Sequence, residues 1–124
     1  MRIWHENTAG FRLLLGLALL LASWLALTPN PIEMPQGMQL DKLAHLATYL
    51  LLAFLVDASW PDRGFGLPKW AFLLGYGIAI ELIQSQIPNR VFSLADVAAN
   101  ATGIVLYALL IRRALRAAGL RYSA

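Results

Sequence analysis

The sequence predicts an all-α fold, a bundle of four transmembrane helices with both termini in the cytoplasm. Of its 124 residues, 59% are hydrophobic and only 14% are charged, which is too little polar surface to cover a soluble domain of this size. The apolar residues fall into four long stretches, and most basic residues flank one set of their ends. In lipid the backbone must satisfy its own hydrogen bonds, so apolar stretches of this kind are expected to form helices.

The apolar stretches define the expected elements of a single domain, residues 1–124. We predict spans at residues 11–28, 41–57, 67–87 and 93–111. The first ends at a Thr-Pro-Asn-Pro sequence, and it lacks the small-residue cleavage site of a signal peptide. The second is apolar only from Leu43 to Val56, and it approaches the roughly 20 residues that a bilayer requires when it begins at Asp41. The third is followed by a Pro-Asn pair, and the fourth by two arginines.

The basic residues predict the orientation of this bundle. One side holds the N-terminus, the loop between the second and third spans, and the C-terminus. That side carries Arg2, Arg12, Arg63, Lys69, Arg112, Arg113, Arg116 and Arg121, whereas the other side carries Lys42 and Arg90. The positive-inside rule therefore places both termini in the cytoplasm. The net charge of +3 is explained by this topology, and we predict the lipid bilayer and no nucleic acid as a partner.

Polar side chains occur at the outer ends of the last three spans. The three groups are Asp41, Lys42, His45 and Tyr49; Glu81 and Gln84; and Arg90, Asp96 and Asn100. Spacings of three and four residues place the members of a group on one helix face. Ionisable groups inside membrane segments are costly unless they face one another or a polar cavity. We therefore predict one polar network that faces the extracytoplasmic side, with Tyr49 and Gln84 at its edge.

Structural roles remain open for several of these positions. Asp41 is placed to cap the start of its helix, and Asp96 follows Ser93 at the spacing of a capping box. Glu81 is harder to explain in this way, because it lies within an apolar run with no terminus to cap. Close helix packing is expected at Gly75, Gly77 and Gly103.

Catalysis is an open alternative at the same residues. His45, Glu81 and Asp96 are the candidate catalytic residues, and with Asp41 they are a possible acid/base or hard-metal ligand set. The chain has no cysteine, no His-Glu-x-x-His zinc motif, no glycine-rich phosphate loop and no Gly-x-Ser-x-Gly sequence. We therefore predict no cofactor and assign no metal, while occupation of the network by an ion stays open.

The three polar groups resemble the motifs of the VanZ-like family of small bacterial membrane proteins. The matching pieces are Asp41-Lys42-x-x-His45-x-x-x-Tyr49, Glu81-x-x-Gln84 and Arg90-x5-Asp96-x3-Asn100-x-x-Gly103, within about residues 40–110. Leu46 departs from the family, which usually has an aromatic residue after the histidine. The resemblance implies a multi-pass protein of the cell envelope, and the family's namesake confers low-level resistance to the glycopeptide teicoplanin.

This resemblance and the polar network together suggest a function. We expect a cell-membrane protein that binds a lipid-linked cell-wall precursor or a lipopeptide (glycopeptide-type) ligand at the outer face. One alternative is an intramembrane hydrolase or transferase that acts on an envelope lipid or precursor. A further alternative is a small transporter subunit, although Glu81 is expected off-centre, toward the outside. The oligomeric state is left open.

Overall fold

The computed structural model describes residues 7–28, 38–88 and 92–119, with the backbone alone for residues 38–41. This part of the chain contains helices and no strand. The helices are α2 (Thr8–Leu27), α3 (Met38–Ser59), α4 (Leu67–Gln84) and α5 (Leu94–Leu106), and α5 continues through a π-helical turn η1 (Tyr107–Ile111) into α6 (Arg112–Ala117). The predicted all-α bundle is confirmed.

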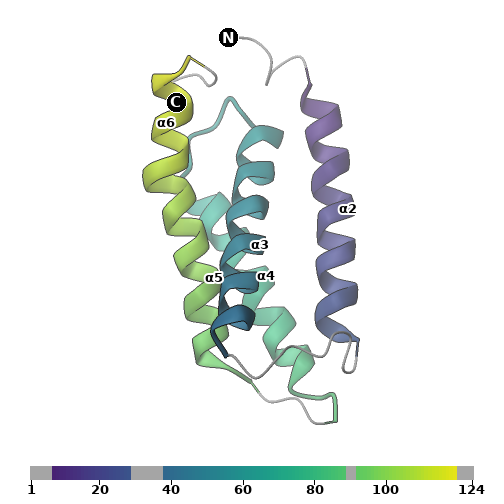
Figure 1. Cartoon of the computed structure of the whole chain (residues 1–124). Coiled ribbons are helices and arrows are strands. Elements are labelled where there is room, and N and C mark those ends of the chain that lie inside the picture. The colour runs from purple at the N-terminus through teal and green to yellow at the C-terminus, as the bar shows by residue number, and fades with distance from the viewer. Residues whose placement is uncertain (1–6, 29–37, 89–91, 120–124) are drawn as a thin grey trace.

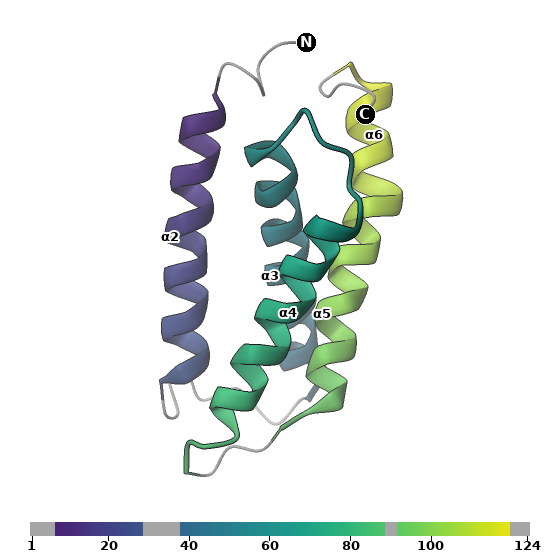
Figure 2. The same ribbon diagram turned by 180° about the vertical axis from the view of Figure 1, so that it is seen from behind.

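The helices run alternately up and down, so that two ends of the bundle can be distinguished. The start of α2 and the end of α6 lie at one end, and the end of α4 and the starts of α3 and α5 lie at the other (Figure 1). α3 packs most extensively against α5 and then against α2, while α4 is inclined across the back of α3 and α5 (Figure 2). The buried core contains Leu15, Tyr49, Leu52, Ala53, Leu55, Val56, Leu73, Ile104 and Tyr107.

Among the described residues, three helical segments are long and apolar enough to cross a membrane: Thr8–Leu27, Lys42–Ser59 and Leu94–Ala117. In α2 only Leu15 is buried, and large apolar side chains such as Leu20 and Trp24 are exposed. Such a surface suits lipid better than water. α4 is not among the three segments, and it carries the buried side chains of Lys69 and Glu81. The described residues contain four long helices, as predicted, whereas a membrane crossing by α4 stays a prediction.

The helix ends differ from the predicted spans at several places. α3 already begins at Met38 and continues to Ser59. α4 ends at Gln84 instead of residue 87, because the next residues form turns in which Gln86 and Ile87 donate to the carbonyls of Ile83 and Gln84. The last helix extends beyond residue 111 to Ala117, because Arg112 has a buried partner inside the bundle, described below.

Two of the three singled-out glycines lie at close contacts. A Cβ atom at Gly103 would overlap the carbonyl oxygen of Leu46 and would lie 3.0 Å from the Leu50 nitrogen. The absence of a side chain therefore lets the backbones of α3 and α5 approach each other. A Cβ at Gly77 would lie 3.1 Å from both Tyr49 Oη and Asn100 Nδ2. The expectation for Gly75 is wrong, because no atom of the described residues outside its own helix lies within 4 Å of its Cβ position.

Candidate functional site

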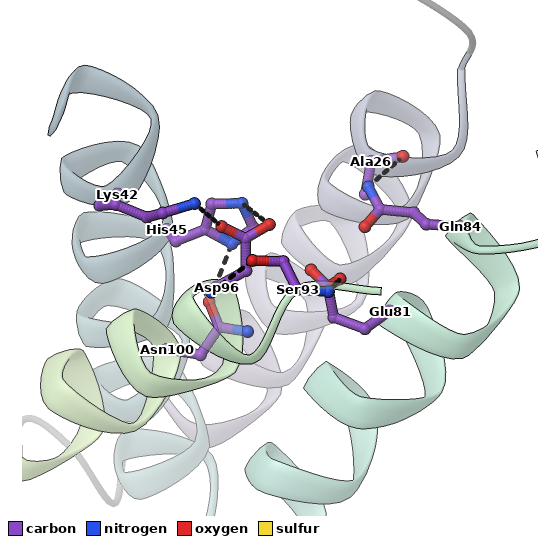
Figure 3. A network of polar contacts seen from close by, with 8 residues as sticks. All are labelled: Ala26, Lys42, His45, Glu81, Gln84, Ser93, Asp96 and Asn100. Carbon is purple, nitrogen blue, oxygen red and sulfur yellow. Dashed lines mark hydrogen bonds and ion pairs between the residues drawn. The ribbon is translucent and has the colours of Figure 1, made fainter. Parts of the chain in front are cut away.

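The polar side chains of three helices meet at the end of the bundle where α4 ends and α3 and α5 begin (Figure 3). The polar cluster, as we call it, consists of Lys42, His45, Glu81, Ser93, Asp96 and Asn100. Because the first two come from α3, the third from α4 and the rest from the start of α5, the site exists only in the assembled bundle.

The start of α5 explains how the two acids of the cluster are oriented. Ser93 is the N-cap of α5, and its Oγ accepts a hydrogen bond of 3.1 Å from the Asp96 backbone N–H. In a capping box the third helical residue would return the bond to the N–H of the cap. Here Glu81 Oε2 of α4 accepts that bond, at 3.1 Å. The carboxylate of Asp96 is thereby left to face α3, and Glu81 has the capping role that the sequence did not suggest.

Asp96 and Asn100 together hold His45. Asp96 Oδ1 accepts from the ammonium group of Lys42, and its Oδ2 lies 3.5 Å from His45 Nε2. On the other side of the ring, His45 Nδ1 lies 2.9 Å from Asn100 Oδ1. An amide oxygen only accepts hydrogen bonds, so Nδ1 carries the hydrogen in this pair. Nε2 is consequently the ring atom that faces the carboxylates.

Glu81 is the most deeply buried acid of the cluster. It is 1% exposed, and its Oε1 has no hydrogen-bond partner among the described residues. One ligand atom each from His45, Glu81 and Asp96 lie within 4.8 Å of one another. Lys42 offers one positive charge against the two carboxylates. The cluster thus carries a net charge of −1 while His45 is neutral, and two carboxylates this close repel each other unless a cation or a proton lies between them.

The remaining predicted site residues lie at different distances from this cluster. Tyr49 is buried one turn deeper, where its hydroxyl and the Asn100 amide both border Gly77. Gln84 does not reach the cluster but donates a 2.6 Å hydrogen bond to the Ala26 carbonyl of α2. Carbonyls of the last helical turn lack intrahelical partners, and this bond satisfies one of them. Arg90 and the side chain of Asp41 lie outside the described residues.

A second polar group, which the sequence did not reveal, lies toward the opposite end of the bundle. Asp57 is fully buried, and its Oδ1 accepts from Lys69 Nζ at 2.6 Å. Its Oδ2 accepts from Tyr107 Oη at 2.5 Å and from Arg112 Nε at 3.1 Å. Lys69 also donates to the carbonyls of Trp60 and Arg63. The sequence predicts Lys69 and Arg112 as charges at the cytoplasmic ends of membrane spans, yet both side chains are buried inside the bundle.

The π-helical turn explains how two side chains of one helix reach the same carboxylate oxygen. Residues five apart in an α-helix differ by about 140° around its axis, so Tyr107 and Arg112 would face different neighbours. In η1 the Arg112 N–H bonds to the Tyr107 carbonyl, five residues earlier. The wider turn brings both side chains to one face. The only sequence signal for this group is a carboxylate, Asp57, directly after a fully apolar run.

Comparison with known proteins gives the family of this chain. A sequence model of the VanZ/LLP1 family matches residues 4–116, which include every member of the polar cluster. The chain belongs to the VanZ/LLP1 family. No curated protein and no solved structure gives a significant match. Its family and its apolar helices identify it as a VanZ-like membrane protein of the cell envelope.

Proposed function

We propose that this VanZ/LLP1 family member crosses the membrane four times and binds an amphiphilic envelope ligand, a lipid-linked precursor or a lipopeptide, at its outer face. The start of α2 and the end of α6 are then cytoplasmic, in line with the positive-inside rule. The end of α4 and the starts of α3 and α5, which carry the polar cluster, lie at the opposite end of the bundle (Figure 1) and would face the outside. This orientation supports a ligand that approaches from the outer leaflet.

One observation carries the proposal: the cluster is partly exposed, and the starts of α3 and α5 that carry it also carry exposed apolar side chains. The side chains of Lys42, His45 and Asp96 are 27%, 21% and 14% exposed. Leu43, which follows Lys42, and Leu94, two residues before Asp96, are both largely exposed. Ligand sites typically combine a mostly apolar surface with a few convergent polar groups. A ligand with a polar head and an acyl chain satisfies both parts of this surface.

The chemistry of the cluster fits the head groups of such ligands. The Lys42 ammonium group can pair with a phosphate or a peptide carboxylate. The carboxylates of Asp96 and Glu81 accept hydrogen bonds from amines and sugar hydroxyls. A ligand phosphate would compete with Asp96 for Lys42, so binding is expected to rearrange that ion pair.

Binding is tested with the purified protein in nanodiscs, fluorescent lipid II as the lipid-linked precursor, and fluorescent teicoplanin as the lipopeptide. We expect saturable binding of at least one probe, weakened about tenfold or more in Lys42→Ala and His45→Ala. Arg113→Ala, an exposed change at the far end of the bundle, is the matched control and should bind normally. Absence of saturable binding for both probes would refute the proposal.

The same experiment separates binding from catalysis. His45 Nε2 beside two carboxylates also suits general acid/base chemistry. Product analysis of the incubated probes is therefore included. Turnover that disappears in both His45→Ala and Glu81→Gln would replace the binding function by an intramembrane hydrolase or transferase. Unchanged probes after saturable binding would support the non-catalytic function.

A further inference from the structure

The side chains of His45, Glu81 and Asp96 each have two polar atoms. In each residue one of these atoms makes a hydrogen bond that holds the side chain in place. His45 Nδ1 bonds to Asn100, Asp96 Oδ1 accepts from Lys42, and Glu81 Oε2 accepts from the Ser93 N–H. The second polar atoms of the three residues are His45 Nε2 and Asp96 Oδ2, which lie 3.5 Å apart, and Glu81 Oε1 (Figure 3). Metal-binding residues in proteins are commonly held in this way, by outer hydrogen bonds that orient each ligand.

The charges of these groups favour a positive centre among them. His45 Nε2 lies 3.5 Å from Asp96 Oδ2, and in the neutral ring with its hydrogen on Nδ1 this nitrogen carries a lone pair. Glu81 Oε1, buried and without a hydrogen-bond partner in the described part of the chain, brings a second carboxylate to the same place. Lone pairs and carboxylates that converge on one point repel one another. A bound cation removes this repulsion and also supplies the partner that Glu81 Oε1 lacks.

We infer that the polar cluster is a binding site for a divalent cation of the zinc class, with His45, Glu81 and Asp96 as its ligands. An imidazole with two carboxylates suits Zn²⁺, Mn²⁺ or Fe²⁺, whereas Ca²⁺ and Mg²⁺ prefer oxygen ligands alone. The assignment rests on the geometry and the charges of the polar cluster, and it holds whether or not the protein binds an envelope ligand.

The spacing of the three residues fits such an ion after small movements. Zinc lies about 2.1 Å from its nitrogen and oxygen ligands, so ligand atoms around it are roughly 3.4 Å apart. The present set lies within 4.8 Å, so side-chain shifts of about an ångström would close it. Three protein ligands leave a fourth position open, as in catalytic zinc sites. The partial exposure of His45 and Asp96 leaves that position accessible to water or to a ligand group.

The test measures metal binding directly, without any envelope ligand. The full chain, purified through a histidine-free tag, is stripped with EDTA, dialysed against Zn²⁺ and analysed by elemental mass spectrometry. We expect close to one zinc per chain and a higher temperature of unfolding with zinc than without. Asn100→Ala removes the partner of His45 Nδ1 and is expected to weaken zinc affinity about 10–100-fold.

Variants of the ligands decide between this site and adventitious binding. Glu81→Gln and His45→Gln keep the side-chain size, and each is expected to lose the stoichiometric zinc; Asp62→Asn, at the far end of the bundle, keeps it. Two ligand variants are used because one of them could fail to fold, and the other then still tests the site. No stoichiometric zinc in the parent protein, or equal zinc affinity in folded Glu81→Gln and in the parent, would overturn the inference. A failure in the lipid II and teicoplanin assay alone would leave it intact.

Discussion

Replacing Asp57 by leucine is expected to lower the free energy of unfolding by about 3–5 kcal/mol. The carboxylate is fully buried and is shared by Lys69 and Arg112, both of which are buried as well. Without it, the two buried cations lose the carboxylate that they share, and the hydroxyl of Tyr107 loses the acceptor that it has at 2.5 Å. Removal of one partner from a buried ion pair costs far more than the pair itself contributes, because the other charge stays desolvated.

The measurement is thermal unfolding in one detergent, with Asp62→Leu as the matched control. Asp62 lies in the exposed turn that follows α3, and surface substitutions usually change stability by no more than about 0.5 kcal/mol. The double variant Asp57→Leu/Lys69→Met should regain part of the lost stability, because it removes one of the two buried cations that lose this carboxylate. Equal stability of Asp57→Leu and Asp62→Leu would show that this carboxylate does not hold the end of the bundle together.

The sequence predicted the helices and the converging polar ends because both follow from local patterns. Apolar runs of bilayer length specify helices, and spacings of three and four residues specify helix faces. Lys42, His45, Asp96 and Asn100 could therefore be placed on facing sides before the structure was known. That these side chains would be near one another follows from the alternating direction of successive helices.

Contacts between distant residues could not be predicted in the same way. Glu81 of α4 accepts the hydrogen bond of the Ser93 N–H at the start of α5. A capping motif describes residues of one segment only, so it cannot predict that the acceptor comes from a different helix. Asp57 meets partners 12 and 55 residues away, and one of them reaches it only because a π-helical turn changes the face of the helix. The hydrogen bond from Gln84 to the Ala26 carbonyl could not be predicted either. Which carbonyls lack an intrahelical partner depends on where α2 ends, and the sequence does not give that helix end to the residue.

Substitution of alanine for Gly103 is expected to destabilise the protein by about 1–3 kcal/mol. The added methyl group would overlap the carbonyl oxygen of Leu46 and crowd the Leu50 nitrogen. Both are backbone atoms of a helix, so they cannot move aside as the end of a flexible side chain can, and α3 and α5 must separate. His45 precedes Leu46, and Asn100 lies one turn before Gly103. The separation should therefore also lengthen the 2.9 Å contact between His45 and Asn100.

Gly75→Ala is the control for this effect, because the same change there meets open space. Alanine is favoured over glycine within a helix by about 1 kcal/mol, so Gly75→Ala should be neutral or slightly stabilising. Thermal unfolding of both variants in one detergent separates the backbone overlap from helix propensity. If Gly103→Ala unfolds at the same temperature as Gly75→Ala, α3 and α5 can move apart without a loss of stability. In that case the close approach of their backbones would not be what positions His45 against Asn100.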